Sequence, residues 1–235
     1  VINLTSLQNA LAGASVTVST GSSGTQAGNI TLSSNLSWSA DTTLTLNAAG
    51  AITLNGSVTN SGSGSGLELI STTGTSITAG VANSGTLTIN GAGTVTSTLS
   101  GSGALVKSGA GVLSIQRNTT YTGATTITGG TLTLENIGTM NSGNYAGNID
   151  IAAGATFRPQ GTQTLSGIVS GLGTITTTGS GGQVITLTGA NTFNGTIATV
   201  SASFVIGGSG VLGGGNFSGT ITTQSTGGTT AFRYS

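Results

Sequence analysis

The sequence predicts an all-β protein, a right-handed parallel β-helix with roughly 20 residues per coil. Three observations predict this fold. Apolar residues come in short bursts that alternate with polar residues, which is a strand signal. Gly (43), Thr (46), Ser (31) and Asn (17) together exceed half of the 235 residues, a composition that favours strands and tight corners. Charged residues amount to 3%, whereas disordered chains usually carry a high net charge.

The alternating bursts define the expected strands. Side chains alternate across a strand, so the flanking aliphatic residues of each burst point inward and the middle residue points outward. In chain order the bursts include residues 16–18, 30–32, 36–38, 44–46, 52–54, 67–70, 87–89, 112–115, 132–134, 149–151, 184–187 and 204–206. At roughly 20 residues per coil, about 12 coils would account for the chain.

Strands this short contribute only one or two inward residues each, so stacked coils bury them better than hairpins do. We expect ladders of inward residues that include Leu44, Leu46, Ile52, Leu54, Leu87, Ile89, Leu132 and Leu134. A β-sandwich remains the alternative fold, because Asn-Gly pairs are also strong hairpin signals.

One segment near the start has a helical pattern. Residues 5–12, TSLQNALA, predict one or two helical turns with Thr5 or Ser6 as the N-cap and Gly13 as the stop. The turns would serve as a docking element or, as we prefer, as a local cover over part of the rod.

The expected corners carry Asn-Gly pairs. Asn55-Gly56, Asn90-Gly91 and Asn194-Gly195 fit left-handed corner conformations, which cost these two residue types least. Pro159 is the single proline, as expected for a chain built of paired strands.

The ionisable residues are too few and too scattered for most catalytic sites. The chain has 4 Lys plus Arg, 4 Asp plus Glu, no His, no Cys and a net charge of +0. The carboxylates Asp41, Glu68, Glu135 and Asp150 stand singly, whereas glycoside hydrolysis needs a pair. Lys107 is the only lysine, so the abundant serines lack an activating base. We therefore assign no catalytic, cofactor or metal residues, and the binding residues are unknown.

The low content of charged residues also limits the partners that we expect. Without a run of Lys or Arg, the electrostatic attraction that dominates nucleic-acid binding is missing, and no stretch of 18 apolar residues predicts a membrane span. The Gly-rich stretches at 207–210 and 213–215 lack the Gly-Lys-Ser/Thr of a phosphate loop.

Aromatic and Thr residues are the candidate binding groups in this sequence. Trp38, Tyr121, Tyr145, Phe157 and Phe193 could stack on sugars, but core packing is the preferred interpretation. Thr-x-Thr triplets suggest an ice-binding face, yet their start positions are 43, 8, 37, 43 and 12 residues apart. Because a flat ice-binding face would require one constant coil period, these Thr residues are better explained as strand formers at solvent-exposed positions. The triplets begin at Thr43, Thr86, Thr94, Thr131, Thr174 and Thr186.

Two stretches resemble known families of secreted bacterial proteins. ASVTVST, AGNITL and LSWSADTTLTLNAAGAITLNGSV, within residues 14–58, resemble repeats of filamentous haemagglutinin-like exoproteins. Residues 101–134, GSGALVKSGAGVLSIQRNTTYTGATTITGGTLTL, resemble the autotransporter-associated β-strand repeat, which runs Gly-x-Leu-x-Lys-x-Gly-x-Gly, a strand, Asn-Thr-Tyr-x-Gly and Gly-Thr-Leu. Arg117 and Asn118 replace its usual Ser-Gly-Ala, and residues 184–196 resemble a worn second copy with Phe193 in place of Tyr121.

These resemblances imply a β-helical segment of a longer secreted protein. We expect residues 1–235 to form a single segment, with haemagglutinin-like repeats over 1–100, autotransporter-type repeats over 101–206 and an unassigned end over 207–235. Val1 is not an initiating Met, which also suggests an excised segment. The families imply a location outside the cell or on the surface of a Gram-negative bacterium, an outer-membrane secretion partner for the parent chain and a host or matrix receptor.

The expected function is that of a non-catalytic stalk or adhesin segment in attachment, biofilm or matrix formation. The alternatives are a polysaccharide-acting β-helix enzyme and an ice-binding β-helix. Some related exoproteins are glycosylated at Asn-x-Ser/Thr triplets, which occur here at Asn3, Asn29, Asn35, Asn55, Asn118, Asn194 and Asn216.

Self-association is the last expectation from the sequence. The end of a β-helix exposes unpaired backbone groups, and the tail from 222 to 235 carries one charge, at Arg233. We expect rods that meet end to end or side by side, as parts of a longer stalk or as separate chains in a filament.

Overall fold

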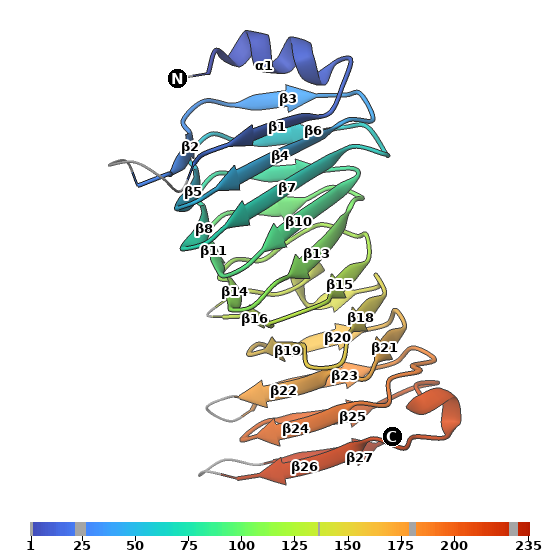
Figure 1. The fold of residues 1–235 in the computed structure, drawn as a ribbon. Coiled ribbons are helices and arrows are strands. Elements are labelled where there is room, and N and C mark those ends of the chain that lie inside the picture. Colours follow the sequence, from blue (N-terminus) through green and yellow to red (C-terminus); the bar gives the residue numbers. More distant parts are fainter. Residues whose placement is uncertain (1, 22–26, 136, 179–181, 226–229) are drawn as a thin grey trace.

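The chain folds into a parallel β-helix, as predicted (Figure 1). The computed structural model describes residues 2–21, 27–135, 137–178, 182–225 and 230–235. The β-helix makes about nine turns of about 22 residues each. Turn length varies: paired residues are 18 apart at Thr75 and Gly93 but 28 apart at Val16 and Leu44. The expected 12 coils were too many, because long corners and an N-terminal helix take up residues.

Two long sheets form two of the three faces of the rod. The eight-stranded sheet contains β1 (Val16–Ser19), β4 (Thr43–Ala48), β7 (Gly66–Ser71), β10 (Thr86–Asn90), β13 (Ala104–Ser108), β15 (Thr125–Ile127), β18 (Ile149–Ile151) and β21 (Val169–Gly171). The ten-stranded sheet contains β2 (Ile30–Leu32), β5 (Ala51–Leu54), β8 (Gly74–Ile77), β11 (Gly93–Val95), β14 (Val112–Ile115), β16 (Thr131–Leu134), β19 (Thr156–Pro159), β22 (Thr174–Thr178), β24 (Thr196–Val200) and β26 (Thr220–Gln224).

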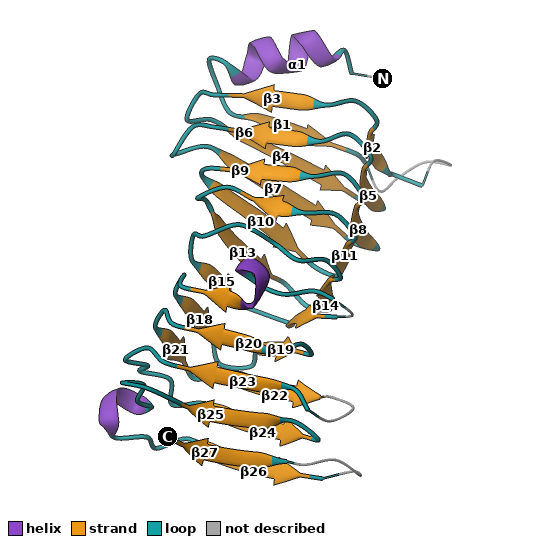
Figure 2. Ribbon diagram, turned by 180° about the vertical axis from the view of Figure 1, so that it is seen from behind, coloured by secondary structure: helices purple, strands orange, loops and turns teal. Residues whose placement is uncertain are grey.

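The third face is divided between two shorter sheets, which follow one another along the rod (Figure 2). The four-stranded sheet contains β3 (Leu36–Trp38), β6 (Val58–Asn60), β9 (Val81–Asn83) and β12 (Leu99–Ser100). The five-stranded sheet contains β17 (Asn144–Tyr145), β20 (Gln163–Leu165), β23 (Val184–Leu187), β25 (Ser203–Ile206) and β27 (Ala231–Tyr234). Short 3-10 turns, η1 (Asn141–Gly143) and η2 (Gly213–Gly215), lie in corner segments.

The core is a set of inward columns of aliphatic side chains. Leu44 pairs with Leu67, which pairs with Leu87, and all three are at most 3% exposed. The eight residues predicted to point inward are all buried. Every ladder between the described strands is parallel, so the alternative of a hairpin-built sandwich is wrong.

The N-terminal helix forms where a helical pattern was predicted, with different ends. Helix α1 (Leu4–Leu11) buries Leu7 and Leu11 and packs on β3 and β1. Its N-cap is Asn3, whose side chain accepts a hydrogen bond from the Ser6 amide, so the prediction of Thr5 or Ser6 was wrong. An Asn side chain one turn earlier satisfies the orphan amide equally well. Figure 1 shows α1 lying across one end of the rod.

The corner glycines are required for two different reasons. Gly91 has φ +101°, as the prediction of a left-handed corner implies. Gly56 and Gly195 are not left-handed; there a Cβ atom would lie 2.1 Å from the Ser34 carbonyl oxygen or 2.0 Å from that of Gly173. At these two corners successive turns approach too closely for any side chain.

The end segment that resembled neither family continues the same architecture. Strand β26 pairs with β24 over five residues, and β27 pairs with β25 over four. Pairing also runs across residue 100, where β10 pairs with β13. Between β12 and β17, by contrast, the third face has corner segments in place of strands.

Candidate functional site

The four carboxylates lie apart, as their sequence spacing suggested. Glu68 and Asp150 point outward in one row of the eight-stranded sheet but four strands apart, which is about 19 Å at the usual strand spacing. Glycosidase carboxylates lie within about 10 Å of each other. Asp41 is exposed and accepts a hydrogen bond from the Gly64 amide, while Glu135 lies beyond β16 in the ten-stranded sheet. The structure therefore places no two of these side chains together as an acid and base.

The described ranges hold neither a metal-binding cluster nor a membrane-spanning helix. No cluster of three or more His, Cys, Asp or Glu side chains occurs there. The helices in these ranges also fall short of the length and apolarity that a membrane crossing requires.

Lys107 is a core residue. It belongs to an inward column of the eight-stranded sheet, between Ile89 and Ile127, and is 0% exposed. Its ammonium donates to three backbone carbonyls, those of Ser108 (2.7 Å), Gly109 (2.8 Å) and Gly129 (3.2 Å). Burial lowers the pKa of this ammonium. Because Gly129 lies in the next turn, Lys107 ties two turns together at one corner.

The aromatic residues considered for sugar stacking all lie in the core. Trp38 is 6% exposed and donates from its indole to the Thr42 carbonyl at 3.0 Å. Tyr121 and Tyr145 share the Thr125 hydroxyl, at 2.7 and 2.8 Å, and their rings meet edge to face at 5.5 Å. Burial raises the pKa of both tyrosines. Phe157 and Phe193 are 0% exposed, so the packing interpretation is confirmed for all five.

A charged cluster lies on the outside of the ten-stranded sheet. Arg158 lies 3.7 Å from Glu135, which also accepts a 2.7 Å hydrogen bond from Ser114. The Arg158 side chain donates to Thr133 at 3.1 Å and covers it, so Thr133 is 0% exposed. Alternation along the strand predicts that Thr133 points outward and is exposed to solvent. Thr133 does point outward, but it is buried because the long Arg158 side chain of the next strand lies over it.

The candidate glycosylation residues have structural roles at the corners. Most accept a hydrogen bond from the helix or from the following turn, as Asn35 does from the Ser57 amide at 3.0 Å. The others that do so are Asn3, Asn29, Asn55, Asn118 and Asn194. Their glycosylation stays a prediction.

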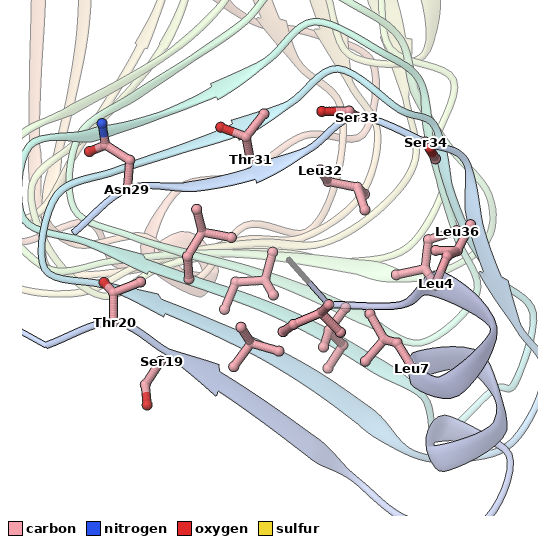
Figure 3. A pocket seen from close by; sticks show the side chains of 15 residues that line it. Leu4, Leu7, Ser19, Thr20, Asn29, Thr31, Leu32, Ser33, Ser34 and Leu36 are labelled. Carbon is pink, nitrogen blue, oxygen red and sulfur yellow. The ribbon is translucent and has the colours of Figure 1, made fainter. Parts of the chain in front are cut away.

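An apolar groove of about 520 Å³ opens beside α1 (Figure 3). Leu4, Leu7 and Leu32 point into it, whereas Ser19 and Thr31 lie on the rim and point away. The groove exists because α1 packs over β3 and β1, while β2 contributes half-buried Ile30 and Leu32 to the opposite wall.

Outward Thr and Ser residues form rows, although the Thr-x-Thr triplets are unevenly spaced in the sequence. On the outside of the ten-stranded sheet, pairing aligns a first hydroxyl row, which consists of Thr31, Thr53, Ser76, Thr94, Ser114 and Thr133. A second row consists of Thr131, Thr156, Thr174, Thr196 and Thr220. Unequal turn lengths are absorbed at the corners, so a constant sequence period is not needed for register. The alternation of Thr with Ile or Leu in each strand was the available signal.

Comparison with known proteins bears on the middle of the chain. Residues 105–134 match the family model described as the passenger-associated-transport-repeat. This match covers the stretch that resembles the autotransporter repeat, including Lys107 and Tyr121. Neither a curated protein nor a solved structure matches the chain. The haemagglutinin-like resemblance of residues 14–58 therefore stays a prediction.

Proposed function

We propose that the chain is a non-catalytic segment of an extracellular autotransporter passenger, which acts as a stalk or adhesin in attachment and biofilm or matrix formation. The match of residues 105–134 to a passenger repeat, inside a continuous β-helix, carries this proposal. A passenger of this kind is exposed outside a Gram-negative cell, and the outer-membrane secretion partner of the parent chain belongs to the same proposal.

The geometry of the rod supports a scaffold. Its stability comes from backbone ladders and inward apolar columns, which repeat from turn to turn. The two hydroxyl rows of the ten-stranded sheet present uncharged hydroxyls, which are available for contact with a surface or matrix. The separated carboxylates support the non-catalytic role, because they leave no acid and base within reach of one bond.

Antibody labelling of intact and permeabilised cells tests the location. Antibodies raised against the folded chain should label intact cells of the source bacterium to the same extent as permeabilised cells. Labelling that requires permeabilisation contradicts the proposal.

Incubation with glycans tests the absence of catalysis. Product release from pectins or other polysaccharides that disappears in Asp41→Asn or Asp150→Asn would establish the polysaccharide-acting alternative. We expect no release by the native chain or by either variant.

A further inference from the structure

A shallow trough runs along the outside of the ten-stranded sheet. It has a volume of about 370 Å³ and crosses β5, β8 and β11, which lie next to one another in the sheet. Successive turns of the rod each contribute one of these strands, which lie next to one another in Figure 1. The lining residues come from the middle of the chain's N-terminal half, away from both ends of the rod.

One wall of the trough is part of the first hydroxyl row. Thr53, Ser76 and Thr94 occupy the same register position on the three strands, so their hydroxyls recur about every 4.8 Å. All three side chains are partly exposed. None of the three hydroxyls bonds to another residue in the described part of the chain, so each can donate and accept a hydrogen bond.

The floor of the trough lacks side chains that would fill it. Gly74 has φ +131° and no side chain; a Cβ atom there would lie in ordinary van der Waals contact, 3.7 Å from the Ala92 carbonyl oxygen. Ala51 and Ala92 continue the floor on the adjacent turns. Val112, 40% exposed, closes the far end with an apolar surface.

The lining of the trough has no ionisable side chain. On the next strand, β14, Ser114 of the first hydroxyl row donates to the charged Glu135 side chain. A ligand of this trough therefore has no counter-charge to pair with, and a charged polymer would lose hydration without compensation. A neutral chain with regularly spaced hydroxyls can hydrogen-bond to the hydroxyl wall and at the same time lie against the small residues of the floor.

We propose that the trough binds a neutral glycan chain lengthwise, with about one sugar ring per turn. The proposal rests on the extracellular function above and gives it a ligand class. The trough supplies a hydroxyl or its acceptor at each turn, and its small residues let the ring face approach the sheet. Ice is the less suitable ligand, because an ice face needs a flat array, and the positions beside this row are Ala51, Gly74 and Val112 rather than a second Thr rank.

Binding of defined oligosaccharides to the full 235-residue chain tests the proposal. Cellohexaose and laminarihexaose serve as neutral probes and polygalacturonate as the charged one, with affinity measured by titration calorimetry. At least one neutral hexaose should bind, and polygalacturonate should bind more weakly.

Isosteric variants locate the site. The triple variant Thr53→Val, Ser76→Ala and Thr94→Val should lose about tenfold or more in affinity, since three hydrogen bonds are removed without a change of shape. Ala51→Leu, which fills the floor, should also weaken binding. The matched control is Thr17→Val, Thr88→Val and Thr126→Val in the outward row of the eight-stranded sheet, which should bind as the native chain does. Circular dichroism and thermal melts verify that all variants remain folded.

Several results would overturn the inference. These are no binding of either neutral hexaose, preferential binding of polygalacturonate, equal affinity in the trough and control variants, or thermal hysteresis in freezing solutions without glycan binding. None of these results bears on whether the chain is exposed on the cell surface, which the cell-labelling experiment measures separately.

Discussion

At the scale of single residues, Lys107 shows how a polar side chain can belong to a β-helix core. Its inward position follows from strand parity, because it is two residues after buried Leu105. The long aliphatic stem fills the column, and the ammonium reaches the corner carbonyls of two turns. Gly130 has no side chain at the place where a Cβ would lie 2.9 Å from that ammonium. Lysine and the glycines around it are therefore one structural unit.

We predict that Lys107→Met lowers the free energy of unfolding by about 1–3 kcal/mol at neutral pH. Methionine keeps the apolar volume but leaves the carbonyls of Ser108, Gly109 and Gly129 without this donor. Chemical denaturation of the native chain and the variant measures the difference. Equal or higher stability of K107M would show that the cost of burying the charged ammonium is as large as the stabilisation from its hydrogen bonds.

The same pair of proteins gives a pH dependence of definite sign. Burial lowers the pKa of Lys107 in the folded state from its ordinary 10.5, so between the two pKa values the unfolded chain binds more protons at this site. Stability of the native chain should therefore rise with pH in that window relative to K107M. The gap between the two proteins should be larger at pH 10 than at pH 7. A gap that shrinks contradicts the direction of the shift.

At the scale of elements, strands such as β6 and β23 alternate between inward and outward residues, but the exposure of an outward residue depends on the neighbouring strands. Thr133 is on the outer row and completely covered by Arg158. Leu132 and Thr133 are both 0% exposed, so substitutions at these two positions would not distinguish inward from outward residues. Val58 and Thr59 of β6 provide a cleaner pair, since Val58 is 1% exposed and Thr59 is exposed.

We predict that Val58→Asp destabilises the fold by more than about 3 kcal/mol, because it buries an unpaired charge between two turns. Thr59→Asp should change stability by less than about 0.5 kcal/mol. Thermal or urea unfolding monitored by circular dichroism gives both values. Equal tolerance at the two positions is incompatible with the inward column.

At the scale of the whole molecule, the two ends of the described rod differ. Helix α1 lies over β3 and β1 at one end. At the other, all five residues of β26 are exposed, including Ile221 (37%), and Tyr234 of β27 is 73% exposed. An uncharged strand with a free edge is a template for pairing with another chain.

We predict that the 235-residue chain associates through β26 in a concentration-dependent way. Thr222→Lys places a charge on the outer row of this edge and should reduce association, whereas Thr59→Lys in the body of the rod should not. Static light scattering over a range of concentrations measures both. A native chain that stays monomeric at high concentration and moderate salt disproves self-association.

The sequence by itself determined the all-β class, the parallel stacking, the inward residues and the lack of paired carboxylates, because these follow from local alternation and composition. Leu44 and Ile52 are buried for reasons visible within a few residues. Only the tertiary structure decided which outward residues stand side by side. Turns of 18 to 28 residues hide the register from any count along the chain, yet ladder hydrogen bonds align Thr53, Ser76 and Thr94 into one wall and bring Arg158 over Thr133. Backbone pairing determines which residues of successive turns are neighbours. Because the corners between the strands differ in length, these neighbours are not separated by a constant number of residues in the sequence.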